Sequence, residues 1–300
     1  MDFQDFTQSR LGVFFGMALG RLLPQEFSYR LSDFIAGRLA QNKDSPMVQA
    51  VRANQWVARG ECSTSEELDA AVREVFAHAG RCFADLYRNL NSPVRLQKMS
   101  PASEDSERLV SQSQDRDFGA LIVAPHLSNF DIVALANAYR GLKGRFLAFG
   151  NPTGGYKLQN RIRVAAGLEV TPIDSKTLRQ AITYLRNGGF VFTGVDRPVS
   201  GKGQQLSFFG RPSPVPTGHI RLALAADVPI VVAATQMRSD GRYYVRVSEP
   251  LRLERHHDTA TRIRINGEAV LRVVEGYIRE KPSQWLMYYP VWPAVLQQGV

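Results

Sequence analysis

The residues best placed to do chemistry lie in one short segment, Ala124-Pro-His126-Leu-Ser-Asn129-Phe-Asp131. It follows an apolar run of the kind that forms a buried strand and opens a helical pattern. A histidine with an aspartate five residues further on can place the carboxylate beside one ring nitrogen, so that the other nitrogen faces a pocket. Such an imidazole can act as a general base on a hydroxyl group. The spacing by itself is also compatible with a structural histidine.

The elements that must position His126 alternate along the chain from Gly119 onward. Short apolar runs typical of buried strands are separated by helical patterns. The expected strands are Ala120–Ala124, Phe146–Phe149, Leu168–Ile173, Phe190–Val195, Leu206–Phe209, Ile230–Ala234 and Tyr243–Val247. The expected helices are Phe130–Tyr139, Tyr156–Ala166, Ser175–Arg186, Thr217–Ala226 and Ile263–Ile278. This order predicts an α/β fold with a mixed, mostly parallel central sheet flanked by helices, and ligands bind at the carboxyl ends of such strands.

The first third of the chain reads as helical. Residues 1–95 are predicted to form a helical segment packed on a catalytic domain of residues 96–300. One helix is expected to start near Phe27, and another at the capping signal of residues 63–66, ending before Pro93.

The apolar stretch Leu11–Leu23 carries Arg21 and precedes Pro24. It is shorter than the roughly 20 apolar residues that span a bilayer. It is therefore either a helix packed on the core or a helix lying in the membrane interface. The chain begins MDFQDF, which is acidic where a secretory signal is basic. No spanning helix is expected, and the protein is expected to be either soluble or bound to one membrane face.

Composition limits the classes of partner. The chain has 300 residues, 44% of them hydrophobic, and a net charge of +9, which suits anionic lipid headgroups, an acidic carrier protein or nucleic acid. The basic residues are scattered and show no nucleic-acid-binding signature, so no nucleic acid is expected. Cys62 and Cys82 stand in no CxxC pair or histidine cluster, and no metal site is predicted.

Other charged and aromatic residues leave two interpretations each. Arg161 and Arg163 can hold a phosphate in a bidentate manner or be solvated charges on a helix. Asp196 and Arg197 follow a buried strand and form either part of a substrate site or a structural ion pair. The aromatic residues of the segment Trp285–Trp292 form either an interfacial belt or part of the core.

The segment His126-Leu-Ser-Asn-Phe-Asp131 resembles the H-x4-D/E motif of glycerolipid and glycolipid acyltransferases. Further segments, in the same order, resemble blocks of the lipid A lauroyl/myristoyl acyltransferases and the phosphatidylinositol mannoside acyltransferases. They are Asn160–Gly167, Asp196–Pro198, Phe208–Gly210, Pro216–Gly218, Leu224-Ala225, Pro229–Val232 and Pro282–Trp285. The resemblance to this superfamily covers about residues 10 to 295.

This resemblance implies a glycerolipid acyltransferase-like fold and direct transfer of a fatty acyl chain. The donor would be acyl-CoA or an acyl carrier protein, and the acceptor a hydroxyl of a membrane glycolipid of the lipid A or phosphatidylinositol mannoside type. His126 would be the general base and Asp131 would orient it. The residues expected to bind substrate are Asn129, Arg161, Arg163, Asp196 and Arg197. No serine or cysteine stands in a nucleophile elbow, so no acyl-enzyme is expected. The implied reaction also needs no cofactor.

Two departures keep the acceptor open. The segment Leu286–Trp292 replaces the Trp-x-His-Arg-Arg/Lys-like stretch of lipid A enzymes, and the HxxNxD form is closer to the mannoside branch. One alternative is a glycerol-phosphate or lysophospholipid acyltransferase, whose Pro-Glu-Gly-Thr motif is missing. Another is a catalytically inactive membrane-surface protein, against which the intact His126 and Asp131 argue. Peripheral attachment to the cytoplasmic face of the cell (inner) membrane, through its anionic surface, is expected.

Overall fold

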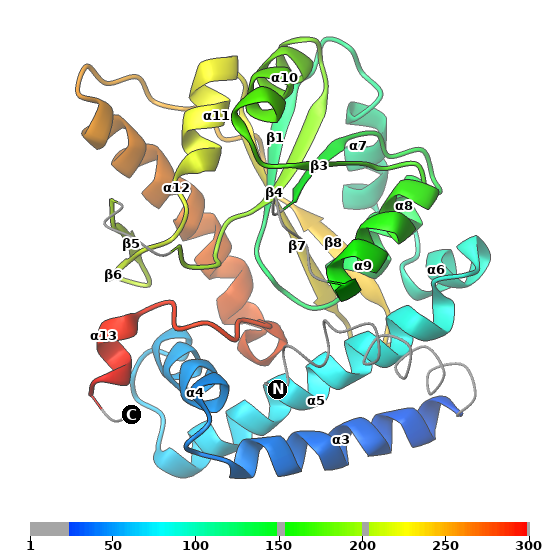
Figure 1. Cartoon of the computed structure of the whole chain (residues 1–300), viewed down its shortest axis with the longest axis vertical. Helices are drawn as coiled ribbons and strands as arrows, with labels where there is room; N and C mark the ends of the chain where they lie inside the picture. The colour runs from blue at the N-terminus through cyan, green and yellow to red at the C-terminus, as the bar shows by residue number, and fades with distance from the viewer. Residues whose placement is uncertain (1–23, 149–153, 200–203, 299–300) are drawn as a thin grey trace.

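A computed structural model describes residues 24–148, 154–199 and 204–298. Helices lie on both faces of a central sheet, and the first helices of the described chain lie together at one end of it (Figure 1). The predicted helix at Leu11–Leu23 lies outside the described residues. Within the described ranges, no helix is both long enough and apolar enough to cross a membrane.

The central sheet has six strands in the order β3-β2-β4-β1-β7-β8. Its strands are β1 (Ala120–Ala124), β2 (Arg145–Ala148), β3 (Glu169–Pro172), β4 (Phe190–Gly194), β7 (Ile230–Met237) and β8 (Tyr243–Val247). All neighbours are parallel except β7 and β8, which are antiparallel. The predicted mixed, mostly parallel sheet is confirmed.

Side chains of β1 alternate between two cores, one on each face of the sheet. Leu121 and Val123 point into the first core, and Ala120 and Ile122 point into the second. The helices over the first face are α10 (Ser175–Arg186), α11 (Gly218–Ala226) and α12 (Thr259–Glu280). Those over the second face are α6 (Pro93–Met99), α7 (Glu104–Gln112), α8 (Phe130–Ala138) and α9 (Gly154–Ala165). Because both faces of β1 are covered, its whole sequence is apolar.

The helices α3 (Gln25–Gln41), α4 (Pro46–Ala58) and α5 (Ser65–Asn89) form the described N-terminal part. The sequence predicted a capping signal at residues 63–66, and the capping box of α5 lies one residue later, between Thr64 and Glu67. Along α5, Val72, Val75 and Phe76 pack with α3 and α4, whereas Cys82 and Leu86 belong to the core of the second sheet face. One long helix thus joins the N-terminal part to the sheet.

The segment Leu206–Phe209 was expected to be one of the strands of the main sheet. Instead, β5 (Leu206–Phe208) pairs with β6 (Arg211–Ser213) in a separate antiparallel hairpin. Phe209 and Gly210 form the turn with φ of 53° and 75°, the pattern of a two-residue type I′ turn. After the hairpin, the chain continues through α11, β7, β8 and α12. It ends in two short elements, η1 (Pro282–Gln284) and α13 (Pro293–Leu296).

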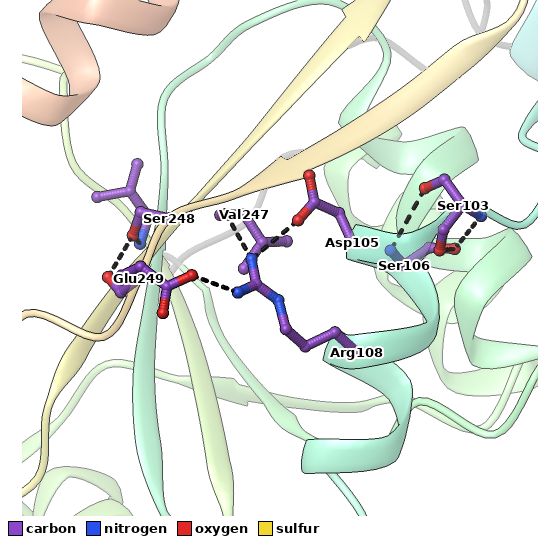
Figure 2. Close-up of polar contacts among 8 residues, drawn as sticks. Ser103, Asp105, Ser106, Arg108, Val247, Ser248 and Glu249 are labelled. Atoms are coloured by element: carbon purple, nitrogen blue, oxygen red, sulfur yellow. Dashed lines mark hydrogen bonds and ion pairs between the residues drawn. The ribbon is translucent and has the colours of Figure 1, made fainter.

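The edge strand β8 is tied to α7 by Arg108, as Figure 2 shows. The guanidinium of Arg108 donates to the Val247 carbonyl at 2.7 Å, to Glu249 Oε1 at 2.6 Å and to Asp105 Oδ1 at 2.9 Å. These contacts cover the end of an edge strand that would otherwise present free backbone groups.

Candidate active site

His126 and Asp196 are brought together by two neighbouring parallel strands. In the register of β1 and β4, Ala124 pairs with Gly194. His126 and Asp196 each lie two residues beyond these partners, at the carboxyl end of the sheet. The Val195 N–H donates to the Ala124 carbonyl at 3.3 Å, which extends the pairing toward the two side chains. The site therefore lies where open α/β sheets bind ligands.

The Asp196 carboxylate is fully buried and accepts three hydrogen bonds. Its Oδ1 lies 2.6 Å from His126 Nδ1, and its Oδ2 accepts from the His126 backbone N–H at 2.8 Å and from Trp285 Nε1 at 2.7 Å. Burial by itself would raise the pKa of Asp196, but the charge of His126 and these hydrogen bonds together lower it below its ordinary value. Asp196 is therefore an anion held against the imidazole.

This contact determines which nitrogen of His126 is available. Because the carboxylate accepts at Nδ1, the proton of the neutral ring lies on Nδ1, and Nε2 carries the lone pair. The side chain of His126 is 33% exposed, and the described residues give Nε2 no hydrogen-bond partner. A Cβ at Gly194 would lie 3.3 Å from the ring carbon Cε1, so glycine leaves the room that the ring occupies. The arrangement can take a proton at Nε2 and stabilise the resulting imidazolium.

The prediction that Asp131 holds the ring of His126 is wrong about the partner. Asp131 Oδ1 accepts from Arg163 Nε at 2.9 Å and from Nη2 at 2.6 Å, and both side chains are nearly buried. Arg163 Nη1 also donates to Asn160 Oδ1 at 3.1 Å. Asp131 lies in the first turn of α8, after a left-handed residue at Ser128 has redirected the chain. Spacing along the sequence therefore gave no guide to the direction of its side chain.

Asn129 and Arg163 were both expected to bind substrate, and each has hydrogen-bond partners within the fold. Asn129 is the N-cap of α8: its Oδ1 accepts from the Ile132 N–H, and its Nδ2 donates to the Cys82 carbonyl at 2.7 Å. It is 5% exposed. Arg163, at 6% exposure, joins α9 to α8 through Asp131 rather than facing solvent. Their polar groups are used within the fold.

With this geometry in view, a comparison with family models gives a match over residues 5–293 to the bacterial lipid A biosynthesis acyltransferases. The chain belongs to that family. It is therefore an acyltransferase enzyme. A comparison with curated proteins finds no match. Membership of the family supports acyl transfer to a glycolipid in broad terms.

Two further predicted residues of this acyltransferase lie closer to solvent. Arg161 is exposed on α9. Arg197, next to the buried Asp196, is half-buried, and its guanidinium lies over the Tyr289 ring at 4.0 Å and donates to the Tyr289 hydroxyl. These two arginines are the predicted substrate contacts that the structure leaves nearest to solvent.

The aromatic segment of the acyltransferase is part of the core. Trp285 and Trp292 are 1% and 2% exposed and pack with Phe208 and Phe209 of the β5–β6 hairpin. The interpretation of these tryptophans as an interfacial belt is therefore wrong. Among the described residues, no group of three or more His, Cys, Asp or Glu side chains could hold a metal ion.

A large hollow of about 1480 Å³ lies at the opposite end of the sheet. Residues that precede β1, β4 and β7 line it, among them Gly119, Gly188 and Pro229, and several arginines stand around it. Neither His126 nor Asp196 lines this hollow. Because the length of β1 separates it from the imidazole, it is not the place where a thioester could meet His126.

The sequence contained a signal for Asp196 as the partner of His126, but it contained little that pointed to Trp285. Asp196 follows its strand just as His126 follows β1, so two similar strand ends carried the signal. The sequence did not show that β4 lies next to β1, and it is this arrangement that brings Asp196 beside His126. Trp285 donates to Asp196 from 89 residues away, and only its Pro-x-x-Trp context marked it.

Two tryptophans allow a matched test of the buried charge. Trp285→Phe removes a donor to a carboxylate, whereas Trp292→Phe removes the donor to the neutral Phe208 carbonyl at 3.1 Å. A hydrogen bond to a charged group contributes about 1.5–3 kcal/mol and a neutral one about 0.5–1.5 kcal/mol. We expect Trp285→Phe to lower the free energy of unfolding by about 1 kcal/mol more at neutral pH.

The lowered pKa of Asp196 also predicts how this difference in stability changes with pH. The lowered pKa of Asp196 contributes stability above the ordinary pKa of about 4, and this is lost as the pH falls through the folded value. The loss in free energy of unfolding caused by Trp285→Phe should therefore shrink as the pH falls, whereas the loss caused by Trp292→Phe should stay constant. Urea titrations between neutral and acidic pH measure both, and equal, pH-independent deficits would contradict a buried Asp196 anion.

The ion pair of Asp131 and Arg163 makes a second prediction. Breaking a nearly buried pair by Asp131→Asn or Arg163→Met should each cost about 3–5 kcal/mol of stability. The double variant should lose clearly less than the sum, because the second change leaves no unpaired charge. The exposed pair Asp227 and Arg255, at 80% and 82% exposure, is the control, and Asp227→Asn should cost less than about 1 kcal/mol. Additive losses at Asp131 and Arg163 would show that the pair is not coupled.

Proposed function

We propose that this chain transfers a fatty acyl group from a thioester donor to a hydroxyl of a membrane glycolipid, with His126 as the general base and Asp196 as its orienting carboxylate. The observation that carries the proposal is the contact of Asp196 with Nδ1, which leaves Nε2 of a partly exposed imidazole free to accept a proton. The acceptor would be of the lipid A or phosphatidylinositol mannoside type.

In the proposed reaction, His126 Nε2 takes the proton of the acceptor hydroxyl while its oxygen attacks the thioester carbonyl. A carbon–oxygen bond forms, the carbon–sulfur bond breaks, and the imidazolium gives its proton to the leaving thiolate. Asp196 stabilises the imidazolium between these steps, as a triad carboxylate does. The transfer is direct and needs no cofactor, with acyl-CoA or an acyl carrier protein as the donor.

Asp131 enters this proposal as a positioning residue. Its ion pair with Arg163 fixes α9 against α8, and α8 begins four residues after His126. Arg161 and Arg197 are proposed to contact acidic groups of the substrates, since guanidinium groups bind phosphate in a bidentate manner. The net charge of +9 supports partners that are anionic, whether a carrier protein or a lipid headgroup.

The general base is tested with purified protein, acyl-CoA or acyl carrier protein as donor, and three acceptors: a lipid A precursor, a phosphatidylinositol mannoside and a lysophospholipid. His126→Ala should lower kcat by about 100- to 10,000-fold. Asp196→Asn should also be severely impaired, because the amide can favour the wrong tautomer and cannot stabilise the imidazolium. His257→Ala, on an exposed residue, is the control. Wild-type turnover by His126→Ala would remove His126 from the mechanism, and transfer to the lysophospholipid alone would overturn the glycolipid acceptor.

The proposed location is the cytoplasmic membrane surface, with peripheral attachment. On α3, Phe27 and Phe34 are 53% and 61% exposed, and Arg38 lies over the Phe34 ring. Aromatic side chains beside arginine suit insertion at a headgroup boundary, and each well-placed cation near an anionic surface contributes about 1 kcal/mol.

Vesicle binding tests this attachment. Binding should rise with the fraction of anionic lipid and fall with salt. Phe27→Ser combined with Phe34→Ser should weaken it, because these variants remove apolar area from the interface. Val164→Ser, at an equally exposed valine on α9, is the matched control. Binding that is indifferent to lipid charge, or equal loss in the control, would contradict attachment through α3.

A further inference from the structure

The turn that carries His126 contains a residue in an unfavourable backbone conformation. Ser128 has a φ of +52° and is 2% exposed. Residues with a Cβ rarely adopt the left-handed region, and such strain persists only where surrounding contacts hold it. Ser128 lies two residues after His126 and just before the cap of α8. Its conformation therefore decides where the chain goes after the imidazole.

Two contacts hold Ser128 in place, and a third holds the residue after it. Its Oγ lies 2.9 Å from His78 Nε2 on α5, and its N–H donates to the Gln284 carbonyl at 2.8 Å. The next residue, Asn129, donates to the carbonyl of Cys82, one helical turn beyond His78. One face of α5 thus holds two consecutive residues of the turn.

His78 is suited to a fixed, uncharged role. It is 7% exposed, and burial lowers its pKa to about 4, so the ring is neutral at physiological pH. The Cys82 Sγ lies 3.4 Å from the same Nε2. Arg81, beside it on α5, is paired with Asp33 on α3. A neutral buried imidazole with a hydroxyl partner is a rigid anchor for that hydroxyl.

We propose that His78 is a positioning residue for His126, which holds Ser128 in the left-handed conformation and so keeps the imidazole in line with Asp196. The inference rests on the proposed function for its effect on catalysis. Its effect on geometry stands apart from that function, because the Asp196 carboxylate contacts both the ring and the backbone N–H of His126. A turn that relaxed after His126 would disturb both contacts at once.

The serine itself provides a matched pair of variants. Ser128→Ala and Ser128→Gly both remove the hydroxyl, but only alanine keeps the Cβ that disfavours a positive φ. We expect His78→Ala and Ser128→Ala each to lower kcat by about 10- to 100-fold with little change in KM, since small displacements of reacting groups have such effects. Ser128→Gly should lower kcat by less than Ser128→Ala. Adding His78→Ala to Ser128→Gly should lower kcat little further.

A second readout does not depend on acyl transfer. The proton in the 2.6 Å contact of His126 Nδ1 with Asp196 should give a far-downfield NMR signal, as short charge-assisted hydrogen bonds do. His78→Ala should shift or broaden this signal, and the Ser128→Gly background should restore it. Val75→Ala, a fully buried position on the α3–α5 side of the same helix, is the control for a general loss of stability.

The outcomes separate the two ideas. If His78→Ala matches Val75→Ala in both kcat and the NMR signal, the positioning role is overturned. If Ser128→Gly is as impaired as Ser128→Ala, the left-handed conformation is not what His78 maintains, and the proposal also fails. If wild-type protein transfers no acyl group but its NMR signal still depends on His78, the proposed function fails while the positioning role is supported.

Discussion

The buried carboxylate of Asp196 is the constraint on which the rest of the site depends. An unpaired charge without exposure to water costs several kcal/mol, so this anion requires all of its donors. The donors come from the ring and backbone of His126, which follows β1, and from Trp285 near the end of the described chain. Because Asp196 follows β4 and two of its three hydrogen bonds come from His126 after β1, the same contacts fix the ends of two central strands and the tautomer of the imidazole.

The C-terminal segment completes this arrangement from outside the sheet. Leu286 donates its N–H to the His126 carbonyl, and Gln284 accepts from the Ser128 N–H, so a short antiparallel bridge forms around Leu127. The Gln284 side chain is in turn bonded to both backbone groups of Met237 at the end of β7. The turn after β1 is thus held between α5 on one side and a segment anchored to β7 on the other. Such fixation from several elements holds the imidazole in one geometry, as the proposed general base requires.

The two carboxylates of the motif region have different tasks. Arg163 offsets the charge of Asp131, and the pair fastens α9 to the start of α8. Asp196 has no arginine or lysine partner among the described residues, so its charge is directed at the imidazole. The environment rather than the residue type therefore separates a structural aspartate from one that can serve a general base.

The sequence alone determined the fold class, because apolar runs of strand length alternating with helical patterns leave few arrangements other than a helix-covered parallel sheet. It also singled out His126 as a candidate general base, since an imidazole directly after a buried strand lies at the ligand-binding edge. Strand order was decided only by the tertiary structure: β4 lies beside β1 although two other strands come between them along the chain. Because these strands are neighbours, the carboxylate that contacts the His126 ring is that of Asp196 and not that of Asp131. The left-handed Ser128 turned the chain so that a local spacing of five residues carried no information about contact. Contacts between residues 50 to 90 positions apart, such as those of His78 and Trp285, arise from packing, and a local pattern cannot encode them.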